Sequence, residues 1–479
     1  MGAARSLIVA IAAVALLASC ASPAQHAAPT TNDEAALSRA VDALVEPLVA
    51  ASQFSGAVAL MRDGRLVHAR GWGLANHASG VAFTPDTPSD GGSLAKTFTA
   101  AGLWRLVHEG RLAMDQPVRT IVPEYPHGGV SVGQLLTHSN GLVLDYDAFD
   151  AHFRPGEARH TAALLTIAGR MAPAPSFPPG SRFEYANLAY DAAGLVIERI
   201  SGQRYEAFVR ERFFRPHGLV HSFARPAHFA DWPVPRARGY RFREGRWQDH
   251  DAYDDEAFLG GSNLIFSATD LARWGQAWAL ARVLPEAAER AGRQAPLIAG
   301  RPSAINGLSW YCDGAGRRCH YSGSLNGFHA LVYWDRDRRE SVAFTSNSAI
   351  PAWPLIALQR ALVDLMAGRP ATAPDPLTAE LKTVERSARG AVAGRYRLPG
   401  MGTATLAVAG ERLQLQIDDG LVYDAHPVSK QVFYVPGTDW WLAFSDTTKS
   451  MVSGVQRVSS PNLHLRGMYH DAQAPRLLP

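Results

Sequence analysis

Lysine is scarce in this chain. The sequence has 47 lysine and arginine residues, but only four are lysines, and Lys96 is the only one before Lys382. An arginine side chain stays protonated at any working pH, whereas a desolvated lysine can release its proton and serve as a base. Lys96 is therefore a candidate for proton transfer. The alternative is a lysine that escaped a general preference for arginine.

The chain also lacks a large excess of positive or negative charge and lacks long apolar runs. The formal net charge is +3 over 479 residues, and no run of like charges is suited to follow a phosphate backbone. Nucleic acid is therefore not an expected partner. The apolar run over residues 7–17 is shorter than the roughly 20 residues that span a bilayer, which predicts a secretion signal rather than a membrane helix.

Residues 1–20 resemble a bacterial lipoprotein signal, because small residues stand directly before Cys20. In such signals the cysteine becomes the lipidated N-terminus; an ordinary signal peptide that is cut elsewhere is the alternative. Residues 21–34 have the composition of a flexible tether. We therefore expect an exported protein on the periplasmic side, anchored by its lipid, with the outer membrane favoured over the inner one.

Cysteine is also scarce. The sequence has three, and after Cys20 only Cys312 and Cys319 remain, in two β-prone segments joined by a glycine-rich turn. In an oxidising compartment this spacing predicts a disulfide bond across the turn. Because no further cysteine or histidine stands at ligand spacing, the pair is a poor zinc site. We expect neither a metal nor another cofactor.

Hydrophobic periodicity predicts an α+β fold. Two β-prone runs over residues 56–68 flank an Asp-Gly turn, which is a hairpin signal. Because strands come from both ends of this region and helices from its middle, we expect an antiparallel sheet flanked by helices, with a helical subdomain. Helical spacing is found over 32–52, 97–111, 189–214 and 268–283, and a second hairpin is predicted over 327–347.

The chain also divides into domains. Residues 35–368 are expected to form the first folded domain, and residues 369–386 a linker that begins with a proline-rich stretch. Short alternating strands separated by turns follow over 387–479, which predicts a separate small domain resembling a β-barrel. The sequence does not indicate an oligomeric state.

Residues 93–96 read Ser-x-x-Lys at the start of a predicted helix. Residues i and i+3 share a face of a helix, so the Ser93 hydroxyl and the Lys96 amine can meet. Backbone N–H groups at the start of the helix can stabilise an oxyanion, and the lysine can activate the serine as a nucleophile. Ser93 and Lys96 are therefore candidate catalytic residues.

Tyr185 and Asn187 form the only Tyr-x-Asn in the chain. A phenol beside a cationic lysine has a lowered pKa and can exchange a proton with a serine or a leaving group. Asn187 can donate to a substrate amide or contact Lys96. Taken alone, Tyr185 would more simply be a buried core tyrosine.

A third element is the turn Tyr321-Ser322-Gly323-Ser324. Gly323 leaves room for a substrate along a strand edge, and the N–H of Ser324 can be a second oxyanion donor. Taken alone, this is only a turn that contains glycine.

Together the three elements resemble the β-lactamase-like serine hydrolases, the family of class C β-lactamases, D-alanyl-D-alanine carboxypeptidases, D-aminopeptidases and related esterases. The order matches: Ser-x-x-Lys, then Tyr-x-Asn, then a turn similar to Lys-Thr-Gly. The segments 134–142, 178–183 and 267–273 are also similar to family segments. The resemblance covers about residues 35–368 and implies the fold of β-lactamases and penicillin-binding proteins.

The resemblance also implies a mechanism. Ser93 attacks a carbonyl, Lys96 and Tyr185 handle the proton, the N–H groups of Ser93 and Ser324 hold the oxyanion, and water releases the acyl group. The expected substrates are esters or amides, among them D-amino-acid peptides and β-lactams.

One departure bears on the substrate. Tyr321 stands where class C β-lactamases have a lysine and their relatives often a histidine. Without that cation the site lacks a group to hold a β-lactam or peptide carboxylate, so we expect weak or no β-lactamase activity; Arg317, Arg318 or His320 are the alternative cations. The departure also leaves open another function, a sensor lipoprotein that binds cell-wall peptides or penicillin without turnover.

Overall fold

The computed structural model describes most of the first domain and parts of the second. Cys20, the predicted signal and most of the predicted tether and linker lie outside the described residues. The described residues are 31–144, 146–154, 157–252, 256–303, 305–349, 352–374, 376, 390, 392–398, 402–410, 412–418, 422–427, 432–435, 441–444, 449–452, 455–458, 463–466, 471–474 and 476–477.

An antiparallel sheet forms the centre of the first domain, and strands from both ends of the domain meet in it, as predicted. The first hairpin turns at Asp63 and Gly64, whose φ angles are 51° and 82°. Positive φ at both positions is what an Asp-Gly hairpin turn favours. Among the described residues the strand order is β14 (Tyr311–Cys312), β15 (Arg318–Leu325), β16 (Phe328–Asp335), β17 (Glu340–Ser346), β1 (Gly56–Arg62), β2 (Arg65–Trp72).

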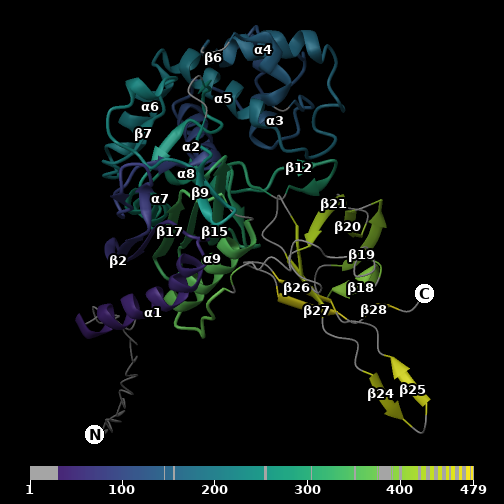
Figure 1. Ribbon diagram of the computed structural model, residues 1–479. Coiled ribbons are helices and arrows are strands. Elements are labelled where there is room, and N and C mark those ends of the chain that lie inside the picture. The colour runs from purple at the N-terminus through teal and green to yellow at the C-terminus, as the bar shows by residue number, and fades with distance from the viewer. Residues whose placement is uncertain are drawn as a thin grey trace, which may run out of the picture.

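Helices cover both faces of this sheet (Figure 1). On one face, α1 (Thr31–Ala50) and α9 (Ala352–Met366) pack against residues of β1 such as Val58. On the other face, α7 (Ala268–Ala279) packs against residues such as Ala59. Because successive side chains of a strand point to opposite faces, β1 contributes to both layers and is buried on both.

The helical subdomain lies beyond the face that α7 covers (Figure 1). The periodic segment 189–214 is not one helix, because α5 (Asn187–Ser201) is terminated by Gly202, which has a left-handed φ of 72°. None of the described helices is long and apolar enough to cross a membrane. The remaining helices of this domain are α2 (Ala95–His108), α3 (Val132–Leu136), α4 (Thr161–Met171), α5 (Asn187–Ser201), α6 (Tyr205–Val209), α8 (Glu286–Gly292), the 3-10 helices η1 (Gly92–Leu94), η2 (Val118–Thr120), η3 (Tyr146–His152) and η5 (Phe229–Asp231), and the π-helical turn η4 (Arg210–Phe214).

Short strands complete the first domain. Two of them, β5 and β11, pair with each other, and β5 leads directly into the helix η1, which the pair helps to position. These short strands are β3 (Leu74–Asn76), β4 (Val81–Ala82), β5 (Ser89–Asp90), β6 (Arg159–His160), β7 (Phe223–Ala224), β8 (Tyr240–Arg243), β9 (Arg246–Asp249), β10 (Glu256–Ala257), β11 (Leu264–Phe266), β12 (Leu297–Ile298) and β13 (Arg301–Pro302).

The C-terminal part is a small antiparallel β-domain with its own core, as predicted. In the part described, β27 and β28 follow one another in the chain but lie at opposite edges of the sheet. The sheet must therefore curl until its edges meet, which is the arrangement of a barrel. The sheet order is β27 (Asp471–Ala474), β26 (Leu463–Arg466), β23 (Trp441–Phe444), β22 (Val432–Tyr434), β21 (Val422–Pro427), β20 (Arg412–Ile417), β19 (Gly402–Ala409), β18 (Gly394–Leu398), β28 (Arg476–Leu477), with β24 (Lys449–Val452) and β25 (Val455–Val458) as a separate hairpin.

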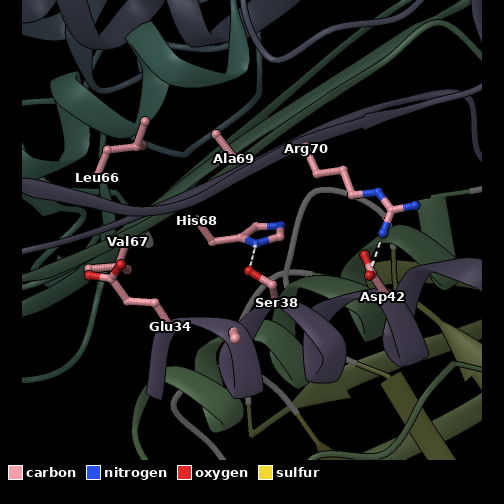
Figure 2. A pocket seen from close by; sticks show the side chains of 9 residues that line it. Glu34, Ser38, Asp42, Leu66, Val67, His68, Ala69 and Arg70 are labelled. Carbon is pink, nitrogen blue, oxygen red and sulfur yellow. Dashed lines mark hydrogen bonds and ion pairs between the residues drawn. The ribbon is translucent and has the colours of Figure 1, made fainter. Parts of the chain in front are cut away.

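Polar contacts hold α1 against β2 beside a groove of 480 Å³ (Figure 2). The hydroxyl of Ser38 lies 3.1 Å from Nδ1 of His68, and Asp42 forms an ion pair with Arg70. The His68 side chain is buried. Burial lowers its pKa from 6.5 to about 4, with Arg70 adding to the effect and Asp42 opposing it.

This contact predicts a pH-dependent stability. His68 is held neutral in the folded protein, so between pH 6.5 and about 4 the unfolded chain binds the proton more readily. Acidification across this window should therefore remove about 3 kcal/mol of stability through His68. Between pH 7 and pH 4, the urea midpoint should fall further for the wild type than for His68→Gln. An equal fall in both proteins would show that His68 does not titrate in this way.

Candidate active site

Ser93 and Lys96 lie at the junction of two helices. Ser93 is in the 3-10 helix η1, and Lys96 is in the first turn of α2. Nζ of Lys96 lies 3.1 Å from Oγ of Ser93. The predicted i, i+3 contact is therefore present, although the helix that carries Lys96 begins after the serine rather than at it.

Lys96 is fully buried and has an acceptor for each ammonium proton. Its Nζ donates to Oγ of Ser93, to Oδ1 of Asn187 at 2.9 Å and to the carbonyl oxygen of Gly261 at 2.9 Å. The rings of Tyr185 and Tyr190 lie 5.1 and 5.6 Å from the same nitrogen, where they stabilise a cation. Asn187 thus contacts Lys96, one of the two roles predicted for it.

Tyr185 brings its hydroxyl to the same point. Its Oη lies 2.9 Å from Oγ of Ser93, while the residue as a whole is 38% exposed. Burial of the hydroxyl opposes ionisation, but the charge of Lys96 and hydrogen bonds with Ser93 and Tyr321 outweigh it and lower the pKa of Tyr185. The phenolate form of Tyr185, which a lowered pKa favours, is therefore suited to accept a proton from Ser93.

Tyr321 occupies the position at which the resemblance to β-lactamases predicts a cationic side chain. Its side chain is buried, and its hydroxyl hydrogen-bonds with Tyr185. Burial, together with the nearby hydroxyl of Tyr185, raises the pKa of Tyr321 well above its usual value. Tyr321 therefore supplies a neutral donor at this position.

The alternative cations are engaged in the hairpin that carries them. Arg317 forms an ion pair with Asp337, and Arg318 pairs with Asp313 at 2.9 Å. His320 is buried and stacks on Tyr311. These contacts hold all three side chains among residues of the β14–β15 hairpin and of the turn between β16 and β17.

Cys312 and Cys319 form a disulfide bond. The two residues are direct partners in the β14–β15 ladder, so the bond joins these strands two residues before Tyr321. No group of three or more metal-binding side chains occurs in the described part of the chain.

Glycines let strand β15 approach the nucleophile closely. A Cβ atom at Gly323 would lie 1.9 Å from the carbonyl oxygen of Gly91 and 2.8 Å from the backbone nitrogen of Ser93, and one at Gly92 would lie 2.8 Å from the backbone nitrogen of Ser324. The N–H groups of Ser93 and Ser324 are thus brought together on neighbouring backbones. The Ser322 and Ser324 side chains are exposed, and Oγ of Ser324 lies 2.7 Å from Nδ1 of His329.

A buried ion pair lies behind the serine, and the sequence did not predict it. Asp90 accepts a hydrogen bond from the backbone nitrogen of Gly92 at 2.9 Å and pairs with Arg225 at 2.8 Å. Both charged side chains are 1% exposed. An aspartate before two glycines was a usable signal for a structured turn. The sequence contained no signal for Arg225, because this residue lies 135 residues from its partner Asp90.

The chain is similar to known proteins across this region. The family model described as Beta-lactamase matches residues 41–365. Penicillin-binding protein 4* of Bacillus subtilis is 22% identical over 426 residues, which cover 85% of this chain and 94% of that protein. Esterase EstB of Burkholderia gladioli is 31% identical over 280 residues, which cover 50% of this chain and 70% of that protein.

A solved structure extends the similarity to the fold of both domains. The octameric penicillin-binding protein homologue from Pyrococcus abyssi superposes with a TM-score of 0.61 at 21% sequence identity, covering 91% of this chain and 99% of that one. At this identity the likeness concerns the fold. The predicted architecture, a β-lactamase-like domain followed by a small β-domain, is thereby confirmed.

Proposed function

The chain belongs to the beta-lactamase family and is one of its serine hydrolases, and from this we propose that it forms an acyl-enzyme on Ser93 with ester or amide substrates that need no carboxylate. The observation that carries the proposal is the convergence of three side chains. Oγ of Ser93 lies 3.1 Å from Nζ of Lys96 and 2.9 Å from Oη of Tyr185. A serine placed in this way meets the geometry of an activated nucleophile.

The proton of Ser93 passes to Tyr185. As an ammonium, Lys96 has no lone pair to accept a proton, and its own three protons are directed at three acceptors. Its charge instead favours the phenolate of Tyr185. Ser93 Oγ then bonds to the substrate carbonyl carbon, while the N–H groups of Ser93 and Ser324 receive the oxyanion.

The acyl-enzyme forms when the leaving group departs. Tyr185 gives its proton to the leaving alkoxide or amine, and the bond between the acyl carbon and the leaving group breaks. Water then enters, gives one proton to the Tyr185 phenolate and attacks the acyl carbon; the bond to Ser93 Oγ breaks, and Tyr185 returns that proton to Ser93. In this scheme Lys96 acts as a fixed cation rather than as the base.

A chemical probe tests the nucleophile directly. We expect the protein over residues 21–479 to gain a single adduct mass from a fluorophosphonate, and Ser93→Ala to gain none. A folded wild type without an adduct would contradict the proposal. If an activated ester acylates the protein but the acyl group is then released slowly or not at all, the result would instead favour the sensor lipoprotein, which binds without turnover.

The substrate preference follows from Tyr321. A neutral phenol cannot form the ion pair that a lysine would offer to a carboxylate, and a hydrogen bond to a charged group contributes about 1.5–3 kcal/mol. We therefore expect kcat/KM for benzylpenicillin to lie about 10- to 100-fold or more below that for a simple activated ester. Comparable values for both substrates, measured side by side, would contradict this preference.

Export and lipid anchoring are part of the same proposal. They are supported by the apolar run over residues 7–17 and by small residues before Cys20. Mass analysis of the full-length chain from a bacterial host should find a lipidated Cys20 in the membrane fraction, with the outer membrane favoured. Cys20→Ser should release the protein from that fraction, whereas an unmodified wild-type terminus would refute the anchor.

A further inference from the structure

His138 lies directly against the phenol that receives the proton. Its side chain is fully buried, and its ring stacks on Tyr185 with the ring centres 4.3 Å apart and the planes 27° apart. The backbone at His138 has a φ of 50°. Positive φ is costly for a residue other than glycine, so this conformation is held by its surroundings.

One residue also holds the backbone on both sides of Tyr185. The backbone nitrogen of Glu184 donates to the carbonyl oxygen of His138 at 2.8 Å. The backbone nitrogen of Ala186 donates to Nδ1 of the His138 ring at 3.1 Å. Since Nδ1 accepts, the neutral ring carries its proton on Nε2. Tyr185 is thus fixed at three points: two peptide groups and the face of its ring.

We propose that His138 is a positioning residue, which holds the Tyr185 phenol in reach of Ser93 and Lys96 through two backbone hydrogen bonds and ring stacking. The inference rests on the proposed function, because it requires that Tyr185 takes part in acylation. The ring must remain neutral to accept from Ala186. Burial and the charge of Lys96 favour this form by lowering the pKa of His138 well below its usual value.

A purely structural role is the competing explanation. His138 also contacts Phe183 and Tyr190, so its loss would lower stability in either case. What distinguishes the two roles is the ionisation of Tyr185, whose hydroxyl contacts Ser93 and whose titratable neighbours besides His138 include Lys96, Tyr190 and Tyr321. If His138 positions Tyr185, its replacement must change the pH dependence of catalysis and not only the amount of folded protein.

Two variants separate the contacts that His138 makes. His138→Asn tolerates positive φ and offers an amide oxygen near the place of Nδ1, but it has no ring. His138→Phe keeps a ring but no acceptor. For each folded variant we expect kcat for an activated ester to fall about 10- to 100-fold with KM nearly unchanged, and the acid limb of the pH–rate profile to move. Unchanged kcat and pH profile in a variant with lowered thermal stability would overturn the proposal.

A double-mutant comparison distinguishes failure of this inference from failure of the proposed function. In the Tyr185→Phe background, His138→Asn should cost less than about twofold in residual kcat, because the residue acts through the missing hydroxyl. An undiminished further loss would show that His138 acts elsewhere. Full activity of Tyr185→Phe alone would contradict the proposed role of Tyr185, and a fluorophosphonate adduct on Ser93→Ala would contradict the nucleophile. If His138→Phe does not fold, His138→Asn decides the outcome.

Discussion

Lys96→Arg should reduce ester hydrolysis by about 10⁴-fold or more, near the level of Ser93→Ala, because the two residues act as a unit. The ammonium of the fully buried Lys96 places its three protons on three acceptors. A planar guanidinium is larger and cannot reproduce this arrangement. Steady-state rates with an activated ester, corrected for folded protein by circular dichroism, give the measurement.

Two comparisons make the Lys96 result interpretable. The double variant Ser93→Ala, Lys96→Arg should be no slower than either single variant, because effects within one catalytic unit are not additive. The control variant Ser38→Ala replaces a serine of α1, which contributes no residue to the site, and this variant should keep the wild-type activity. A folded Lys96→Arg protein with substantial turnover would mean that neither a compact cation nor lysine proton exchange is needed.

Gly323→Ala should lower kcat by about 10²-fold or more, the typical effect of losing one oxyanion donor. The added Cβ would lie 1.9 Å from the carbonyl oxygen of Gly91 and 2.8 Å from the nitrogen of Ser93. Both neighbours are backbone atoms, so β15 must move away from η1. The distance between the N–H groups of Ser93 and Ser324 would then increase. Initial rates together with thermal melting measure the change.

The hairpin itself offers a matched control. Gly314 lies in the β14–β15 turn, and a Cβ there would meet nothing within 4 Å. Gly314→Ala should therefore leave both activity and melting temperature nearly unchanged. If Gly323→Ala behaves like Gly314→Ala, then β15 does not supply the second oxyanion donor, and the role assigned to Ser324 fails.

Local patterns in the sequence predicted most of the fold. The Asp63-Gly64 turn specified the first hairpin, because both positions readily take positive φ. The i, i+3 spacing of Ser93 and Lys96 specified their contact through the geometry of a helical turn. The periodic segment 189–214 was less informative, because periodicity does not show that Gly202 ends the helix.

Contacts between distant segments could be predicted only in part. The resemblance to a family indicated that Ser93, Tyr185 and Ser324 share one site, because the three motifs occur in the order in which the family has them. The family pattern placed His138 close to the site in a structural hydrogen-bonding role, but it did not indicate the stacking on Tyr185, nor did it indicate Arg225 behind Asp90. These residues contribute through neighbours in space, and no spacing along the chain encodes that.

The sequence by itself determined which chemistry this protein can carry: one early lysine beside a serine, a later tyrosine and a glycine turn without a cation. Tertiary structure decided how these groups meet and which charges lie beside them. Lys96 lies buried among three acceptors and two rings, and its charge lowers the pKa of Tyr185. Electric fields and desolvation depend on distances in space, so only the fold could set the pKa of Tyr185.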